Sequence, residues 1–273
     1  MRYHEYFEIS EKQGWRVTDL DWRELTADDA AGRVSEFDKQ ALVATAVIEH
    51  GVPHYGEVWS LVEGLRDDWE LWQFTTLWTG EESRHSYALG KACATLGLET
   101  RAASDLAAVR VFPLAQTQKR SCPADCYRTI PGMLAYTVIQ ELATQRFYTL
   151  ASKRTASRFV RKLLALIAAD ELRHHVFYRD ALQRLYAESS DRTAYSDRVF
   201  QAVRAFKMPH LFYGVQTDFF EHGDWAFTAM SQLAFKAQLA RCFAFDASLI
   251  ARLMVAEKFN ATASAEHRSH ETS

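Results

Sequence analysis

The sequence predicts an all-α protein built around long helices packed in one bundle. Its 273 residues are 48% hydrophobic, which is enough material for one large core. Only 11 Gly and 5 Pro are present, and no Gly/Ser-rich or Pro-rich stretch provides an obvious linker. β-branched residues are scattered and do not alternate as strands require. We therefore expect a single helical domain over residues 1–260.

Apolar residues recur at helical spacing in four long segments, which form the predicted core of the bundle. These segments are residues 34–65, 67–96, 126–152 and 158–187. A shorter helix is expected between the second and third, at residues 102–117, and this long connection suits a single crossover. Further helices are expected at residues 192–206, 214–233 and 235–258. Residues 261–273 are polar and lack periodicity, which predicts a disordered tail.

The bulk properties of the chain exclude several classes of function. A formal net charge of −3 gives no basis for nucleic-acid binding. Four scattered cysteines do not make a disulfide framework, and reduced thiols indicate the cytoplasm. Residues 1–14 lack the pattern of a signal peptide. The longest apolar stretches, such as residues 41–48, are far shorter than the roughly 20 residues of a membrane span.

Two of the long segments repeat one motif of acidic residues and histidine. Residues 81–85 read Glu-Glu-Ser-Arg-His, and residues 170–174 read Asp-Glu-Leu-Arg-His. Residues three apart lie on one face of an α-helix, so the second Glu and the His of each motif can chelate one metal ion. These two pairs are Glu82 with His85 and Glu171 with His174.

The other two long segments each place one carboxylate in an apolar run, at Glu49 and Glu141. A Glu from each of two helices and a Glu-x-x-His from each of the other two form the ligand set of carboxylate-bridged di-iron bundles. One such motif alone is usually solvated, but two copies with two intervening carboxylates favour a buried metal pair. The sequence therefore predicts a ferritin-like four-helix di-iron bundle with additional flanking helices. Its expected ligands are Glu49, Glu82, His85, Glu141, Glu171 and His174.

The acidic residue before each ligand pair is expected to support a histidine. A metal-bound imidazole normally donates its free ring N–H to a carboxylate or carbonyl. We expect a crossed arrangement, with Asp170 accepting from His85 and Glu81 accepting from His174. Arg84 and Arg173 follow these acids by three residues and would neutralise them. The alternative is a pair of ordinary surface ion pairs.

Ordered motifs over residues 35–258 resemble those of the acyl-carrier-protein desaturase family. The motifs are Ile48-Glu49 with Pro53-His54-Tyr55, Trp78 to His85, Gln140 to Thr144, Ile167 to His174, and Met208-Pro209-His210. The resemblance implies two iron ions per chain, O2 as oxidant, a ferredoxin or similar electron donor, and a homodimer. It also implies removal of two hydrogens from a fatty acyl chain held on an acyl carrier protein. The chain is shorter than the plant members, especially after the fourth long helix.

Thr144 matches a threonine beside the oxygen pocket of that family, which implies a catalytic role for its hydroxyl. The alternative is a helical threonine bonded to its own backbone. Pro53 is expected to bend the helix that carries Glu49, unless that helix ends near Gly51. The aromatic residues Trp59, Trp72, Phe74, Trp78, Phe147 and Tyr148 are interpreted chiefly as core packing.

Two further features concern partners. Trp15 or Trp22 is a candidate relay for electrons. A basic cluster marks the junction of the third and fourth long helices, and it consists of Lys153, Arg154, Arg158, Arg161 and Lys162. Carrier proteins and ferredoxins are usually acidic, so this cluster is a candidate docking patch, with a solvated helix start as the alternative.

The same ligand set serves several reactions, so other functions stay open. A di-iron oxygenase that hydroxylates a carrier-bound acyl or aminoacyl chain would need the same residues. Iron storage or peroxide handling is weakened by the length of the chain and by the absence of a Cys-x-x-Cys module. A radical-generating subunit of ribonucleotide reductase is disfavoured because Leu89 stands where that family has Tyr.

Overall fold

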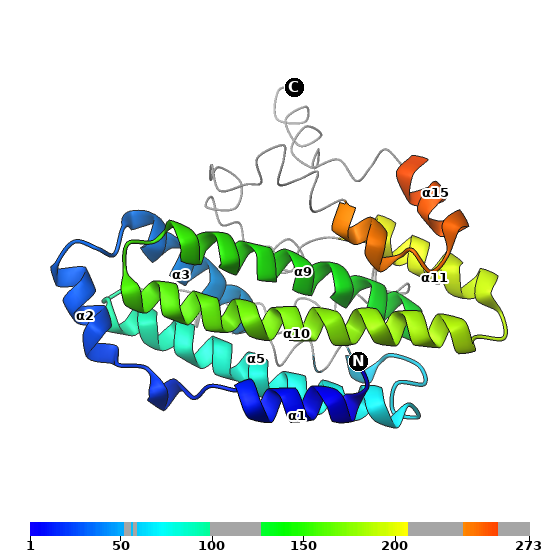
Figure 1. The fold of residues 1–273 in the computed structure, drawn as a ribbon, viewed down its shortest axis with the longest axis horizontal. Helices are drawn as coiled ribbons and strands as arrows, with labels where there is room; N and C mark the ends of the chain where they lie inside the picture. Colours follow the sequence, from blue (N-terminus) through cyan, green and yellow to red (C-terminus); the bar gives the residue numbers. More distant parts are fainter. Residues whose placement is uncertain (52–55, 57–58, 99–126, 207–236, 256–273) are drawn as a thin grey trace, which may run out of the picture.

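The computed structural model describes residues 1–51, 56, 59–98, 127–206 and 237–255. Within these ranges the chain is helical, and the only β-pairing is an isolated bridge between Glu63 and Thr129. The predicted all-α class is confirmed. Four helices run side by side along the molecule (Figure 1), and they are α3 (Glu36–Glu49), α5 (Trp69–Thr95), α9 (Ile130–Arg154) and α10 (Arg158–Glu188).

Side-chain caps define where the bundle helices begin. Each N-terminal neighbour accepts a backbone N–H of the first turn, which satisfies one of the donors that a helix start leaves free. These caps are Ser35, Asp68, Thr129 and Ser157. Only residues 155–157 connect α9 to α10, so these two helices pack as antiparallel neighbours (Figure 1). Residues 132–143 of α9 are buried without interruption, so this helix lies at the centre of the core.

Two predicted helices end differently from their sequence-based bounds. The single helix predicted over 34–65 is wrong as a continuous element: α3 ends at Glu49, residues 56 and 59–60 are helical, and residues 61–68 form turns. A helix end near Gly51 was the alternative, and Gly51 and Pro53 both disfavour continuation. Pro53 itself lies outside the described residues. The segment 235–258 is also broken, because the chain turns at 243–245 before α15 (Ala247–Val255).

Asp246 explains the break before α15, since its carboxylate accepts the backbone N–H groups of Ser248 and Leu249. The helix predicted at 192–206 is present as α11 (Arg192–Ala205). The helices expected at 102–117 and 214–233 and the tail at 261–273 lie outside the described residues.

Two short helices near the N-terminus were not predicted. They are α1 (Tyr3–Gln13) and α2 (Trp22–Ala30), separated by a 3-10 turn, η1 (Val17–Asp19). α1 lies along α5, and α2 packs against α10 and α5 (Figure 1). Each of the two helices buries one apolar and one polar side chain, so neither carries the apolar periodicity on which the prediction depended.

The core consists of two apolar clusters separated by a polar layer. One cluster includes Phe74 and Trp78 of α5 with Phe177 of α10. The other includes Leu89 of α5 and Ile167 of α10. The repeated motifs at 81–85 and 170–174 fall between them along both helices, so their side chains lie in the middle of the bundle. No helix in the described ranges is both long and apolar enough to cross a membrane.

Candidate metal centre

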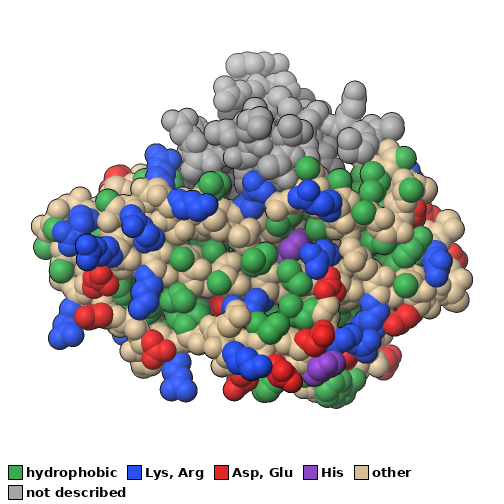
Figure 2. Space-filling view, viewed as in Figure 1, with side chains coloured by type: hydrophobic (Ala, Val, Ile, Leu, Met, Phe, Trp, Pro, Cys, Tyr) green, Lys and Arg blue, Asp and Glu red, His purple; other side chains and the backbone are tan. Residues whose placement is uncertain are grey.

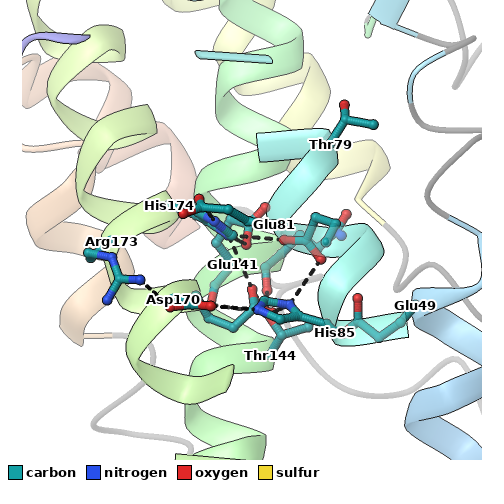
Figure 3. Close-up of polar contacts among 12 residues, drawn as sticks. Glu49, Thr79, Glu81, His85, Glu141, Thr144, Asp170, Arg173 and His174 are labelled. Atoms are coloured by element: carbon teal, nitrogen blue, oxygen red, sulfur yellow. Dashed lines mark hydrogen bonds and ion pairs between the residues drawn. The ribbon is translucent and has the colours of Figure 1, made fainter. Parts of the chain in front are cut away.

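The six predicted ligands meet in the polar layer between the two apolar clusters. Figure 3 shows Glu49, His85, Glu141 and His174 directed toward one centre from the bundle helices. None of the six side chains is more than 5% exposed. Their ligand atoms form two groups of four, within each of which all atoms lie within 4.8 Å of one another. The groups are Glu49, Glu82, His85, Glu171 and Glu82, Glu141, Glu171, His174.

Glu82 and Glu171 belong to both groups, so they lie between two adjacent positions for a cation. This follows from helix geometry, because each is three residues before its histidine on the inward face. Glu49 and Glu141 each belong to one group only. The arrangement is therefore two overlapping sites that share two carboxylates.

The chemistry of these donors fits a bound metal pair. Five buried side-chain atoms of the six residues have no hydrogen-bond partner among the described residues. These atoms are Oε1 of Glu82, Glu141 and Glu171, and Nδ1 of His85 and His174. Each buried polar atom without a partner costs about 1–3 kcal/mol. Divalent cations would satisfy all of them at once, and imidazole with carboxylate oxygens suits iron or manganese.

Burial and mutual repulsion govern the charges of the centre. Burial, with the charge of Glu82, raises the pKa of Glu49 well above its ordinary value. Burial and the charge of Glu171 do the same to the pKa of Glu141. Burial also opposes the charged form of Glu171, but the neighbouring imidazoles of His174 and His85 lower the pKa of that carboxyl. Burial thus opposes the charged form of both terminal carboxyls in the metal-free protein, and a bound cation would favour that form.

Behind each inward histidine lies the carboxylate that the crossed arrangement predicts. Nε2 of His85 lies 2.9 Å from Oδ2 of Asp170, and Nε2 of His174 lies 3.0 Å from Oε2 of Glu81. These bonds leave both Nδ1 atoms facing the centre. Burial opposes the charge of Asp170, but its bond to His85 lowers the pKa of its carboxyl, so the imidazole is the donor.

The arginines of the two motifs form ion pairs with the same two carboxylates, Asp170 and Glu81. Nη2 of Arg84 lies 3.4 Å from Asp170 and 3.5 Å from Glu81, and Arg173 pairs with Asp170. Asp170 is fully buried and Glu81 is 3% exposed, so the alternative of ordinary surface ion pairs is wrong.

The N-terminal helix supplies partners that the sequence did not reveal. Tyr6 and Ser10 of α1 both donate their hydroxyl hydrogens to Glu81. Nε1 of Trp15 donates to Oδ2 of Asp170 at 2.9 Å, and its ring is stacked parallel to His85 with centroids 6.2 Å apart. The sequence marks Trp15 only as one of two candidate relays, and the other candidate, Trp22, donates to the carbonyl of Val17. Tyr6 and Ser10 are one helical turn apart, but nothing in a short polar helix signals a buried contact.

Thr144 makes the backbone contacts given above as the alternative to a catalytic role, and it also contacts a carboxylate of the centre. Its Oγ1 lies 3.0 Å from Oε2 of Glu171 and 3.1 Å from the backbone carbonyls of Gln140 and Glu141. One hydroxyl hydrogen serves one of these acceptors at a time. Tyr148, which was interpreted chiefly as core packing, also contacts the centre, because its buried hydroxyl donates to Oε1 of Glu49.

The family model described as fatty acid desaturase matches residues 15–238, which include every residue of the centre except Tyr6 and Ser10. The chain belongs to this desaturase family. The resemblance to acyl-carrier-protein desaturases is thereby confirmed at the level of the family.

Individual relatives of this desaturase-family chain are distant. The protein named "Putative acyl-acyl-carrier-protein desaturase DesA1" of Mycobacterium tuberculosis (strain CDC 1551 / Oshkosh) is 25% identical over 190 residues, 67% of this chain and 53% of the relative. Stearoyl-acyl-carrier-protein 9-desaturase 5, chloroplastic, of Oryza sativa subsp. japonica is 28% identical over 205 residues, 70% and 49% of the two chains. Stearoyl-acyl-carrier-protein 9-desaturase 4, chloroplastic, of Arabidopsis thaliana is 26% identical over 163 residues, 56% and 38%. The chain thus spans about half the length of the curated relatives it matches.

The basic cluster of this desaturase-family chain lies at one end of the bundle, over the turn between α9 and α10, where Figure 2 shows Lys and Arg side chains gathered. All five of its side chains are exposed, and none forms an ion pair with a described carboxylate. Arg154 instead lies over the ring of Phe37 at 4.1 Å, and Arg161 donates to the carbonyl of Thr155. Its charges are therefore unpaired among the described residues, although Arg158 lines a surface depression together with Glu24 and Asp28.

Proposed function

We propose that this protein is an O2-dependent acyl-acyl-carrier-protein desaturase that removes two hydrogens from a carrier-bound fatty acyl chain at a di-iron centre. The observation that carries the proposal is the pair of overlapping Glu/His groups, placed within a chain that the fatty acid desaturase family matches over residues 15–238. Fold and family by themselves would leave the reaction open, so the buried donors carry the argument.

In this proposal two Fe2+ ions occupy the two groups of ligands. Glu49 and His85 would hold one ion, Glu141 and His174 would hold the other, and Glu82 and Glu171 would contribute to both positions. The bound iron pair supplies the O2 and one-electron chemistry that no protein side chain can provide.

The protein contributes position, exclusion of water and proton placement. Asp170 and Glu81 fix the imidazole tautomers, so that Nδ1 of each ring stays available to a cation. The apolar clusters on both sides of the polar layer keep bulk water from the centre. We assign the hydroxyl of Thr144 to catalysis, because its Oγ1 lies 3.0 Å from Oε2 of Glu171 and Thr144 is one helical turn after Glu141 on α9.

An acyl carrier protein is the partner we propose for substrate delivery, because the relatives named above are desaturases of carrier-bound chains. A ferredoxin or similar protein would supply electrons, and Trp15 is the better relay candidate because it contacts both Asp170 and His85. The exposed basic cluster offers a surface for either acidic partner. We further propose a homodimer that works in the cytoplasm, where the buried free thiols Cys93 and Cys242 stay reduced.

The experiment that tests the proposal is an intact-mass assay of acyl carrier proteins loaded with different acyl chains. Each is incubated aerobically with the iron-loaded protein, ferredoxin, its reductase and NADPH, and Glu171→Gln provides the metal-deficient control. Loss of two hydrogens from one member supports desaturation and fixes the preferred chain. Gain of one oxygen would replace desaturation by hydroxylation at the same centre. An unchanged mass across a panel of carrier-bound chains would overturn both.

A further inference from the structure

The hydroxyl of Tyr148 is held by one terminal carboxylate of the metal centre. Tyr148 lies on α9, seven residues after Glu141 and therefore about two turns along the same face. Its side chain is 1% exposed, and its O–H donates to Oε1 of Glu49 at the end of α3. Glu49 is itself 4% exposed, so this hydrogen bond forms in surroundings of low dielectric constant, which strengthen it.

Glu141 is the counterpart of Glu49 in the other group, and it has no such donor. Its Oε1 is buried without a hydrogen-bond partner among the described residues, and its Oε2 lies 3.5 Å from Nδ1 of His174. The two groups are otherwise alike in their donor atoms, although different side chains support Asp170 and Glu81. Each has one histidine fixed by a carboxylate, at 2.9 and 3.0 Å, and both share Glu82 and Glu171. The Thr144 hydroxyl is directed at Glu171, which is common to both groups, so it cannot distinguish them.

The direction of a hydrogen bond decides its effect on a metal ligand. Asp170 and Glu81 accept hydrogen from the imidazoles, which makes each ring a stronger electron donor. Tyr148 does the opposite, because it donates hydrogen to the carboxylate and draws electron density away from Glu49. It also stabilises the metal-free carboxylate, and a cation bound at Oε1 would have to share the lone pairs of that oxygen with this bond.

We propose that Tyr148 makes the two metal positions unequal, so that the position of Glu49 and His85 binds a divalent cation more weakly than the position of Glu141 and His174. The inference rests on the metal centre of the proposed function. A hydrogen bond to a charged group corresponds to a factor of about ten or more in a dissociation constant. The position of Glu49 therefore fills last and empties first when metal is scarce.

A titration of the metal-free, full-length protein with Co2+ tests the proposal, followed by calorimetry and by the visible absorption of bound cobalt. We expect two steps of one equivalent each, with dissociation constants about tenfold or more apart. His85→Ala should remove the weaker step and His174→Ala the tighter one. Tyr148→Phe should tighten the weaker step about tenfold and leave the tighter step unchanged.

Tyr178→Phe is the matched control, because Tyr178 is also 1% exposed but its hydroxyl has no described hydrogen-bond partner. It should leave both steps unchanged, and far-UV circular dichroism verifies that each variant is folded. A single step of two equal equivalents in the wild type would overturn the proposal. So would a Tyr148→Phe variant whose weaker step is unaltered or weakened further.

This readout separates the inference from the proposed function. Two equal binding steps in the cobalt titration would overturn the proposed inequality but would still be consistent with a two-metal enzyme. Two unequal binding steps together with no change in acyl mass would overturn the proposed desaturase activity and support the inequality. Failure to bind any Co2+ overturns both.

Discussion

Nε2 of His85 on α5 lies 2.9 Å from Oδ2 of Asp170 on α10, and the reciprocal pair, His174 with Glu81, is separated by 3.0 Å. Each copy of the repeated motif thus supplies the hydrogen-bond acceptor for the histidine of the other copy. The acidic residue before each Glu-x-x-His therefore has a structural role: it accepts a hydrogen bond from the histidine of the neighbouring helix, while the ligands of its own motif point to the centre. The two helices are consequently interlocked by buried, charge-assisted bonds.

Shared and terminal carboxylates should differ in how much metal their loss removes. Glu171→Gln is expected to reduce bound iron from two per chain to less than one, because Glu171 contributes to both groups. Glu49→Gln should remove only one, since Glu49 contributes to one group. Metal content per folded chain after desalting, measured by mass spectrometry of the elements, decides this. Equal losses in the two variants would contradict the overlapping arrangement.

Asp170→Asn should weaken metal binding about 10–100-fold, the usual cost of losing the carboxylate behind a metal-bound histidine. The amide keeps the size of Asp170 but removes the charge that holds the ring N–H of His85. Affinity is measured by competition with a chelator of known strength. Asp180→Asn is the control, because Asp180 lies on the same helix and pairs only with Arg179 and the N-terminal amine among the described groups. If both variants lose affinity equally, the assignment of Asp170 fails.

Tyr6→Phe should lower the free energy of unfolding of the metal-free protein by about 1–3 kcal/mol, because buried Glu81 loses a hydrogen-bond donor. Tyr3→Phe on the same helix is the comparison, since no hydrogen bond of its hydroxyl is found among the described residues, and it should change stability by less than about 0.5 kcal/mol. Urea denaturation followed by circular dichroism gives both values. An equal effect of the two substitutions would show that α1 stabilises the bundle only by packing.

Asp28 predicts a pH-dependent contribution to stability away from the metal centre. Its carboxylate on α2 is 1% exposed and accepts from the hydroxyl of Ser157, the N–H of Phe159 and the guanidinium of Arg33. Burial alone would raise the pKa of Asp28, but these bonds lower it from 3.8 to about 2. Because the folded value lies below the unfolded one, the stabilisation is present above about pH 4 and is lost as pH falls toward 2.

Asp28→Asn should therefore cost about 2 kcal/mol at neutral pH, and the difference from the wild type should shrink between about pH 4 and pH 2. Urea denaturation at a series of pH values measures it. Asp29→Asn is the control, since Asp29 is partly exposed and its pair with Lys39 is worth less than about 1 kcal/mol. A difference that grows as pH falls would reverse the sign and refute the assignment.

Charge reversal of the basic cluster should weaken the productive encounter with acyl carrier protein. Arg158→Glu with Lys162→Glu is expected to raise the KM for the carrier-bound substrate about tenfold at low salt while leaving kcat nearly unchanged. The effect should diminish as added salt screens it. Lys12→Glu, an exposed charge on α1, is the control. A fall in kcat alone would point to damage of the metal centre instead.

The sequence by itself determined the all-α class, the bounds of α5, α9 and α10 to within a few residues, and the six residues that meet at the centre. Helical periodicity and three-residue spacing are local properties, so a single chain displays them directly. The crossed contacts were also predictable, because the acids and histidines occupy equivalent places in two copies of one motif.

The tertiary structure decided what no local pattern encodes. The contacts of Tyr6, Ser10 and Trp15 with the acids of the centre, and that of Tyr148 with Glu49, join residues between 71 and 155 positions apart. The end of α3 at Glu49 also differs from the predicted bound, because the apolar periodicity of the sequence continues past the Gly and Pro that follow Glu49. The sequence does not show whether a Tyr, Ser or Trp side chain only packs or also donates a hydrogen bond, because only the fold brings its acceptor within reach.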